Sequence, residues 1–70
     1  MAHLDQSTKD DLEQLIDRNG LDAVLDALRD ICAEKAEHVL TNWQDKQAAK
    51  DWDQAASVLD RASAKISILL

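Results

Sequence analysis

The sequence contains no proline, no phenylalanine and no tyrosine, and it has a single glycine, Gly20, and a single cysteine, Cys32. One cysteine cannot form a disulfide within the chain. Flanked by Ile31 and Ala33, Cys32 is typical of a small buried apolar side chain in a reducing compartment. The apolar residues are mostly alanine and leucine, which favour helix over sheet. The composition therefore predicts an all-α fold.

Long apolar runs and positive charge are also scarce. No apolar run exceeds the three residues of Ile68–Leu70, whereas a membrane-spanning helix needs about 20. The opening residues, Met1–Asp5, lack the basic and apolar regions of a secretory signal. With 14 acidic and 8 basic side chains the net charge is -6, which repels phosphate backbones and anionic lipids. We therefore expect a cytoplasmic protein that binds neither nucleic acid nor membrane directly.

The spacing of apolar residues predicts three helices, at about 8–19, 21–42 and 46–68, in one domain that follows a flexible N-terminus at 1–6. Ser7 and Thr8 each precede an aspartate by three residues, which approximates a capping box and predicts the start of the first helix. Asn19-Gly20 predicts its end, since glycine readily adopts the left-handed conformation of a Schellman motif.

The second and third predicted helices carry the longest apolar patterns. In the second helix, apolar residues cover a broad face: Leu21, Leu25, Leu28, Cys32 and Val39, widened by Val24, Ile31, Ala36, Leu40 and Trp43. In the third helix, a heptad seam alternates alanines with larger residues: Trp52, Ala55, Leu59, Ala62, Ile66 and Leu69. Small residues at such positions let two helices approach closely. We expect a long antiparallel hairpin preceded by a short helix.

The boundary between the two long helices is open, because no glycine or proline marks it. Asn42 could end the second helix and Asp45 could cap the third, which predicts a turn at 42–45. The alternative is one unbroken helix through this segment.

A 70-residue chain buries only about 60% of the surface that it exposes when unfolded, so small domains commonly need additional stabilisation. Two hairpins packed face to face in a helical bundle would cover the apolar side chains that a single hairpin and its short first helix leave exposed. We therefore expect a homodimer, or alternatively a different protein covering the same patch. The residues expected at the interface are Ile31, Leu40, Trp43, Trp52, Leu59 and Ile66.

Residue types suited to catalysis or metal binding gather only near the middle of the second helix. Glu34 and His38 are four residues apart and share a helix face, which makes them weak metal candidates. Lys35 stands where the di-iron Glu-x-x-His pattern needs a glutamate, so a solvated pair is the simpler interpretation. We predict no cofactor, no metal site and no catalytic residue, and hence a protein that is not an enzyme.

An acidic row also follows the second helix at intervals of four residues: Asp22, Asp26, Asp30 and Glu34. The row excludes a DNA-reading helix-turn-helix around Gly20, since it would be repelled from the major groove. It is either a solvated outer face or a docking surface for a basic partner, as in an acidic inhibitor that mimics nucleic acid.

The segment Ile31–His38, continuing through Asn42-Trp43-Gln44-Asp45, resembles small uncharacterised bacterial helical proteins. The resemblance implies a bacterial origin and no activity. We predict a non-enzymatic interaction or regulatory protein that acts through protein–protein contacts. The alternatives are the acidic inhibitor and, third, a metal-binding helical bundle.

Overall fold

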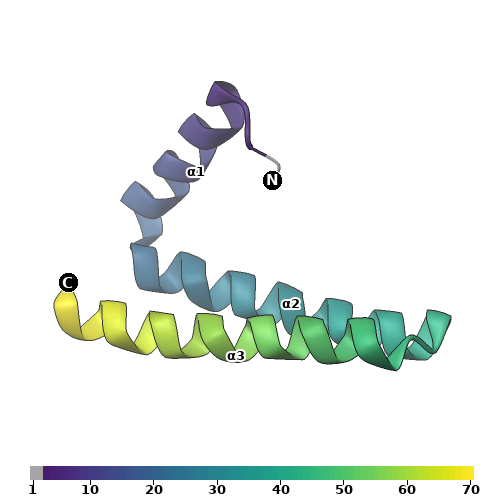
Figure 1. The fold of residues 1–70 in the computed structure, drawn as a ribbon. Helices are drawn as coiled ribbons and strands as arrows, with labels where there is room; N and C mark the ends of the chain where they lie inside the picture. Colours follow the sequence, from purple (N-terminus) through teal and green to yellow (C-terminus); the bar gives the residue numbers. More distant parts are fainter. Residues whose placement is uncertain (1–2) are drawn as a thin grey trace.

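The computed structural model describes residues 3–70, and in this range the chain forms three helices and no strand (Figure 1). Helix α1 spans Gln6–Asn19, α2 spans Leu21–Trp43 and α3 spans Lys46–Leu69. Helices α2 and α3 lie side by side and antiparallel, whereas α1 leaves the start of α2 at a steep angle (Figure 1). The predicted all-α fold, with a short helix before a hairpin, is confirmed. Part of the N-terminal segment predicted to be flexible, residues 1 and 2, lies outside the described residues.

Helix α1 begins one residue before the expected caps. The carboxylate of Asp5 accepts a hydrogen bond from the Thr8 backbone amide at 2.8 Å, which satisfies one of the amides left free at a helix start. Hydrogen bonds from the Thr8 side chain and backbone hold the pKa of Asp5 below its usual value. The prediction that Ser7 or Thr8 caps this helix is wrong, because both already lie inside α1.

Gly20 joins α1 to α2. Its N–H donates to the Ile16 carbonyl at 2.7 Å, and its own carbonyl accepts from the Val24 amide at 3.2 Å, so it ends one helix and starts the next. Its φ is 92°, as a glycine permits, but its ψ of 148° is extended. The predicted Schellman motif, which needs a left-handed helical residue, is therefore wrong. The extended ψ directs α2 away from the axis of α1.

The hairpin turns at Gln44 and Asp45. Gln44 has a left-handed conformation, with φ 52° and ψ 30°, and its N–H donates to the Leu40 carbonyl at 3.2 Å. Asp45 caps α3 by accepting from the Ala48 amide at 3.0 Å. The predicted turn and the Asp45 cap are confirmed, and the unbroken helix is wrong. Asn42 is still helical, and its side chain donates to the His38 carbonyl at 3.1 Å.

Small side chains form the centre of the hairpin. The buried residues in the described range are Ala36 on α2 and Ala49, Ala56 and Ser63 on α3. Those on α3 recur every seven residues, so they follow one line along the helix, beside the predicted seam. Alanines thus form the contact between α2 and α3 as expected, although Ala56 and Ser63 each lie one residue after an alanine of the predicted seam. No large side chain of the described residues is fully buried.

Candidate functional site

The first two members of the acidic row participate in helix pairing. The Ser63 hydroxyl on α3 lies 2.5 Å from a carboxylate oxygen of Asp26 and 3.1 Å from the Asp22 carbonyl oxygen. The Ser67 hydroxyl donates to the Asp22 carboxylate at 2.9 Å. Asp22 and Asp26 are half-buried, so the expectation that they stand on the outer side of α2 is wrong. Half of the row therefore has a structural role.

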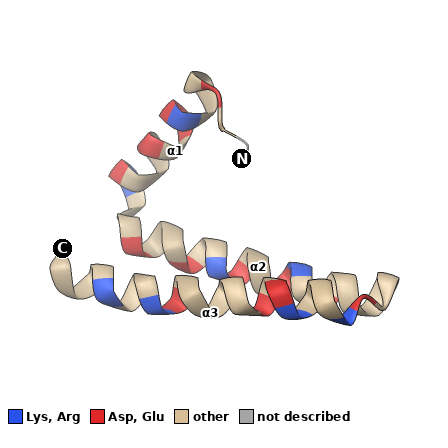
Figure 2. Cartoon of the chain, in the orientation of Figure 1, with Lys and Arg blue, Asp and Glu red and all other residues tan. Residues whose placement is uncertain are grey.

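Arg29 provides the positive charge at this contact. Its guanidinium lies 2.8 Å from the Asp60 carboxylate on α3 and 3.2 Å and 3.5 Å from those of Asp30 and Asp26. Hydrogen bonds to Asp60 and then to Asp30 raise the pKa of Arg29. Acidic and basic residues are interspersed along both helices of the hairpin (Figure 2). The charge of this surface is therefore partly compensated within the chain.

Glu34 and His38 are exposed on α2. The Nδ1 atom of His38 lies 2.9 Å from the amide nitrogen of Asn42. Within residues 3–70, no three side chains of the types that ligate metals gather closely enough to hold an ion. The local geometry thus pairs His38 with Asn42.

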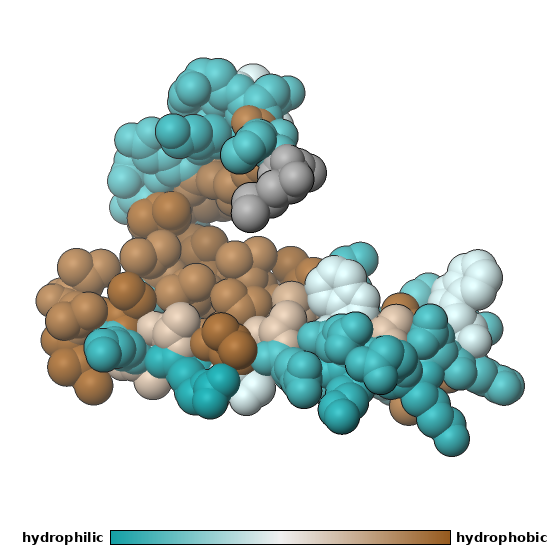
Figure 3. Space-filling view, in the orientation of Figure 1, coloured by the Kyte–Doolittle hydropathy of each residue, from teal (hydrophilic) through white to brown (hydrophobic). Residues whose placement is uncertain are grey.

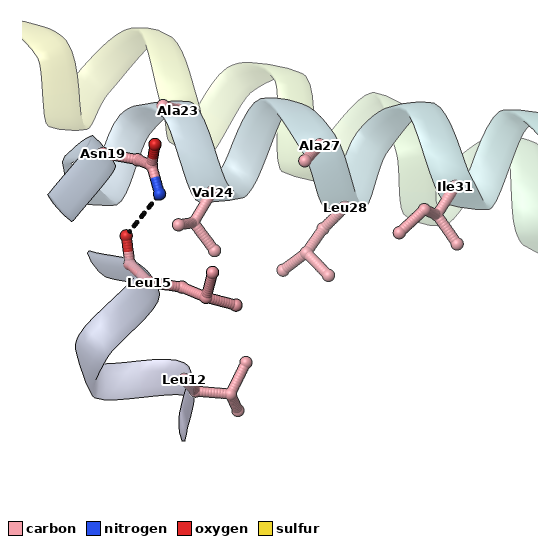
Figure 4. Close-up of a pocket in the computed structure, with 8 residues that line it drawn as sticks. All are labelled: Leu12, Leu15, Asn19, Ala23, Val24, Ala27, Leu28 and Ile31. Carbon is pink, nitrogen blue, oxygen red and sulfur yellow. Dashed lines mark hydrogen bonds between the residues drawn. The ribbon is translucent and has the colours of Figure 1, made fainter. Parts of the chain in front are cut away.

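An apolar groove separates α1 from α2. Its volume is about 490 Å³, it is open to solvent, and its lining contains no ionisable residue. The lining residues are Leu12, Leu15, Asn19, Ala23, Val24, Ala27, Leu28 and Ile31. Leucines of α1 point toward the side chains of α2, and the Asn19 amide donates to the Leu15 carbonyl at 2.9 Å where the helices meet (Figure 4). Leu12 and Leu15 were not predicted as site residues, although their short apolar face was visible in the sequence.

The residues predicted for an interface lie in separate places. Ile31 lines the groove, whereas Leu59 and Ile66 are half-buried along the hairpin. Leu40 is exposed on the last turns of α2, and Trp43, at the turn of the hairpin, is 74% exposed. Apolar side chains gather at the end of the hairpin next to α1, and the far end is mainly hydrophilic (Figure 3). The apolar surface in this view thus covers the side of α2 that faces α1 and continues over the end of the hairpin where α3 finishes.

Trp52 has a charged neighbour from α2. The Lys35 ammonium nitrogen lies 5.6 Å from the centre of the Trp52 ring, within the range of a cation–π interaction. Lys35, which interrupts the apolar stripe in the sequence, thus covers the tryptophan that is exposed on α3.

In the described part of the chain, no helix combines the length and apolar character that crossing a membrane requires. No family model, no curated protein and no solved structure matches this chain.

Proposed function

We propose that this chain is a non-enzymatic interaction protein that acts through protein–protein contacts and pairs with a second copy in a helical bundle. The proposal rests mainly on its exposed surface. A compact monomer of 7.8 kDa exposes about 4,400 Å², whereas this chain exposes 5670 Å². Its radius of gyration is 13.9 Å, compared with about 11 Å for a compact domain of this length.

The excess surface is large enough for a stable dimer. The difference between the two areas is about 1,300 Å² per copy, whereas a standard interface buries about 800 Å² per partner. Two copies that recover the excess would bury about 2,600 Å² in total, which is typical of obligate homodimers. Large apolar side chains are available for this contact, because Leu15, Leu28 and Ile31 are all more than a third exposed.

The contacts of the acidic row favour this proposal over an acidic inhibitor that mimics nucleic acid. Such a mimic needs carboxylates free to replace phosphates, whereas those of Asp22 and Asp26 accept hydrogen bonds from α3. We further propose a bacterial origin, which the sequence resemblance implies, and a cytoplasmic location, which the charge and short apolar runs of the sequence favour.

Sedimentation equilibrium tests the proposal directly. We expect a mass of twice 7.8 kDa over a wide range of concentrations. The midpoint of thermal unfolding should rise with concentration, because association stabilises the folded state by mass action. A monomer at every concentration, with a constant midpoint, would contradict self-association.

A further inference from the structure

We infer that the groove between α1 and α2 is the surface at which two copies meet, each placing its α1 against the groove of the other. This inference rests on the proposed self-association and assigns it to one face. The two-fold arrangement presents the same residues on both sides, as closed homodimers do.

The packing of α1 supports this assignment. None of its residues is buried within its own chain. Leu12 and Ile16 are half-buried and Leu15 is exposed, so packing against α2 covers the apolar side of α1 only in part. Because α1 stands away from α3 (Figure 1), the hairpin does not provide the second. An α1 helix from another copy would supply apolar side chains of the same kind.

The charge of the chain also bears on which face two copies can share. Each copy carries a net charge of -6, so carboxylates that face each other across a contact would add to the repulsion between two copies. The groove lining has no ionisable residue. Contact between the two linings would therefore place no lining carboxylate against another.

A pair of variants that each introduce one charge tests whether the groove is the contact face of the dimer. Ile31 lines the groove and is 48% exposed, and Val58 on α3 lies outside it and is 54% exposed. Both are mid-helix branched residues, so the change to glutamate costs each helix a similar amount. We expect Ile31→Glu to raise the dimer dissociation constant at least about a hundredfold, because it leaves an unpaired charge in the contact. Val58→Glu should change it by less than about threefold.

Circular dichroism of each variant checks that the helices form. If Ile31→Glu does not fold, Ala27→Glu replaces it, since Ala27 lines the groove and is exposed. A folded Ile31→Glu or Ala27→Glu that dimerises like the wild type overturns the assignment while the proposed dimer stands. If Val58→Glu also dissociates the dimer, the assignment of the groove is overturned as well, because Val58 lies outside the groove.

The remaining outcomes test self-association separately from the choice of the groove as the contact face. A wild-type protein that is monomeric contradicts self-association itself. A groove of about 490 Å³ is also within the size range of small-molecule pockets. Native mass spectrometry that finds a monomer carrying a small apolar ligand would therefore overturn the inference.

Discussion

Replacing Ser63 with alanine tests whether the polar contact between α2 and α3 stabilises the hairpin. Ser63 is 4% exposed, and its hydroxyl has one proton for two acceptors, the Asp26 carboxylate at 2.5 Å and the Asp22 carbonyl at 3.1 Å. The closer and charged acceptor is the stronger one. Ser63→Ala removes this donor and leaves both acceptors in place.

The expected magnitude follows from the exposure of the acceptor. A hydrogen bond to a charged group contributes about 1.5–3 kcal/mol. The Asp26 side chain is 48% exposed, so water replaces part of the lost bond and the expected loss is about 1 kcal/mol. Alanine also forms helix better than serine, by about 0.5 kcal/mol. The matched control is Ser57→Ala, at an exposed position of α3. It brings the same gain in helix propensity but removes no hydrogen bond between the helices.

Thermal unfolding followed by circular dichroism measures the difference between the two variants. For a chain of this size, about 1 kcal/mol corresponds to a midpoint lower by roughly 4–8 °C in Ser63→Ala than in Ser57→Ala. The protein concentration must be the same in both samples, because association shifts the midpoint. Equal midpoints would refute the stabilising role of Ser63.

Three further predictions concern the helix ends. Gly20→Ala should lower the free energy of unfolding by about 1–3 kcal/mol in urea melts, because the residue has φ 92° and a new Cβ would lie 3.0 Å from the Asp22 carboxylate; no loss would contradict this backbone geometry. Gln44→Gly should raise the free energy of unfolding by about 0.5–1 kcal/mol, because glycine adopts the left-handed conformation of this position without steric strain. A decrease would contradict this expectation. The pKa of Asp5 is lower in the folded chain, so its stabilisation is present above the unfolded value near 3.9 and is lost as pH falls through the folded value. Thermal midpoints of Asp5→Asn should therefore fall less on acidification than those of the wild type, and parallel curves would contradict the cap.

The helices could be predicted from the sequence because their signals are local. The apolar spacing and the single glycine placed α2 and α3 within a residue of their observed ends. The turn at Gln44 and Asp45 followed from capping chemistry, since Asp45 needs only the amide of Ala48, three residues ahead. Such contacts depend on neighbours in the chain, which a sequence shows directly.

The polar contact between the helices could not be predicted in the same way. Arg29 follows Leu25 by four residues and precedes Cys32 by three, which places it on the line that faces α3. Its partner, Asp60, is 31 residues away in the chain, so their pairing depends on the register of the hairpin. The groove depends likewise on one angle, the ψ of Gly20, which glycine leaves free to adopt several values.

The exposed apolar surface follows from the way the hairpin is packed. With alanines and one serine at the centre of the contact, the two helices can approach closely, and their largest side chains have no room between them. Those side chains must then lie at the edges or on the outer faces of the pair, as Leu28 and Ile31 do. The small-residue seam therefore accounts for the exposed apolar surface, which the proposed association would cover.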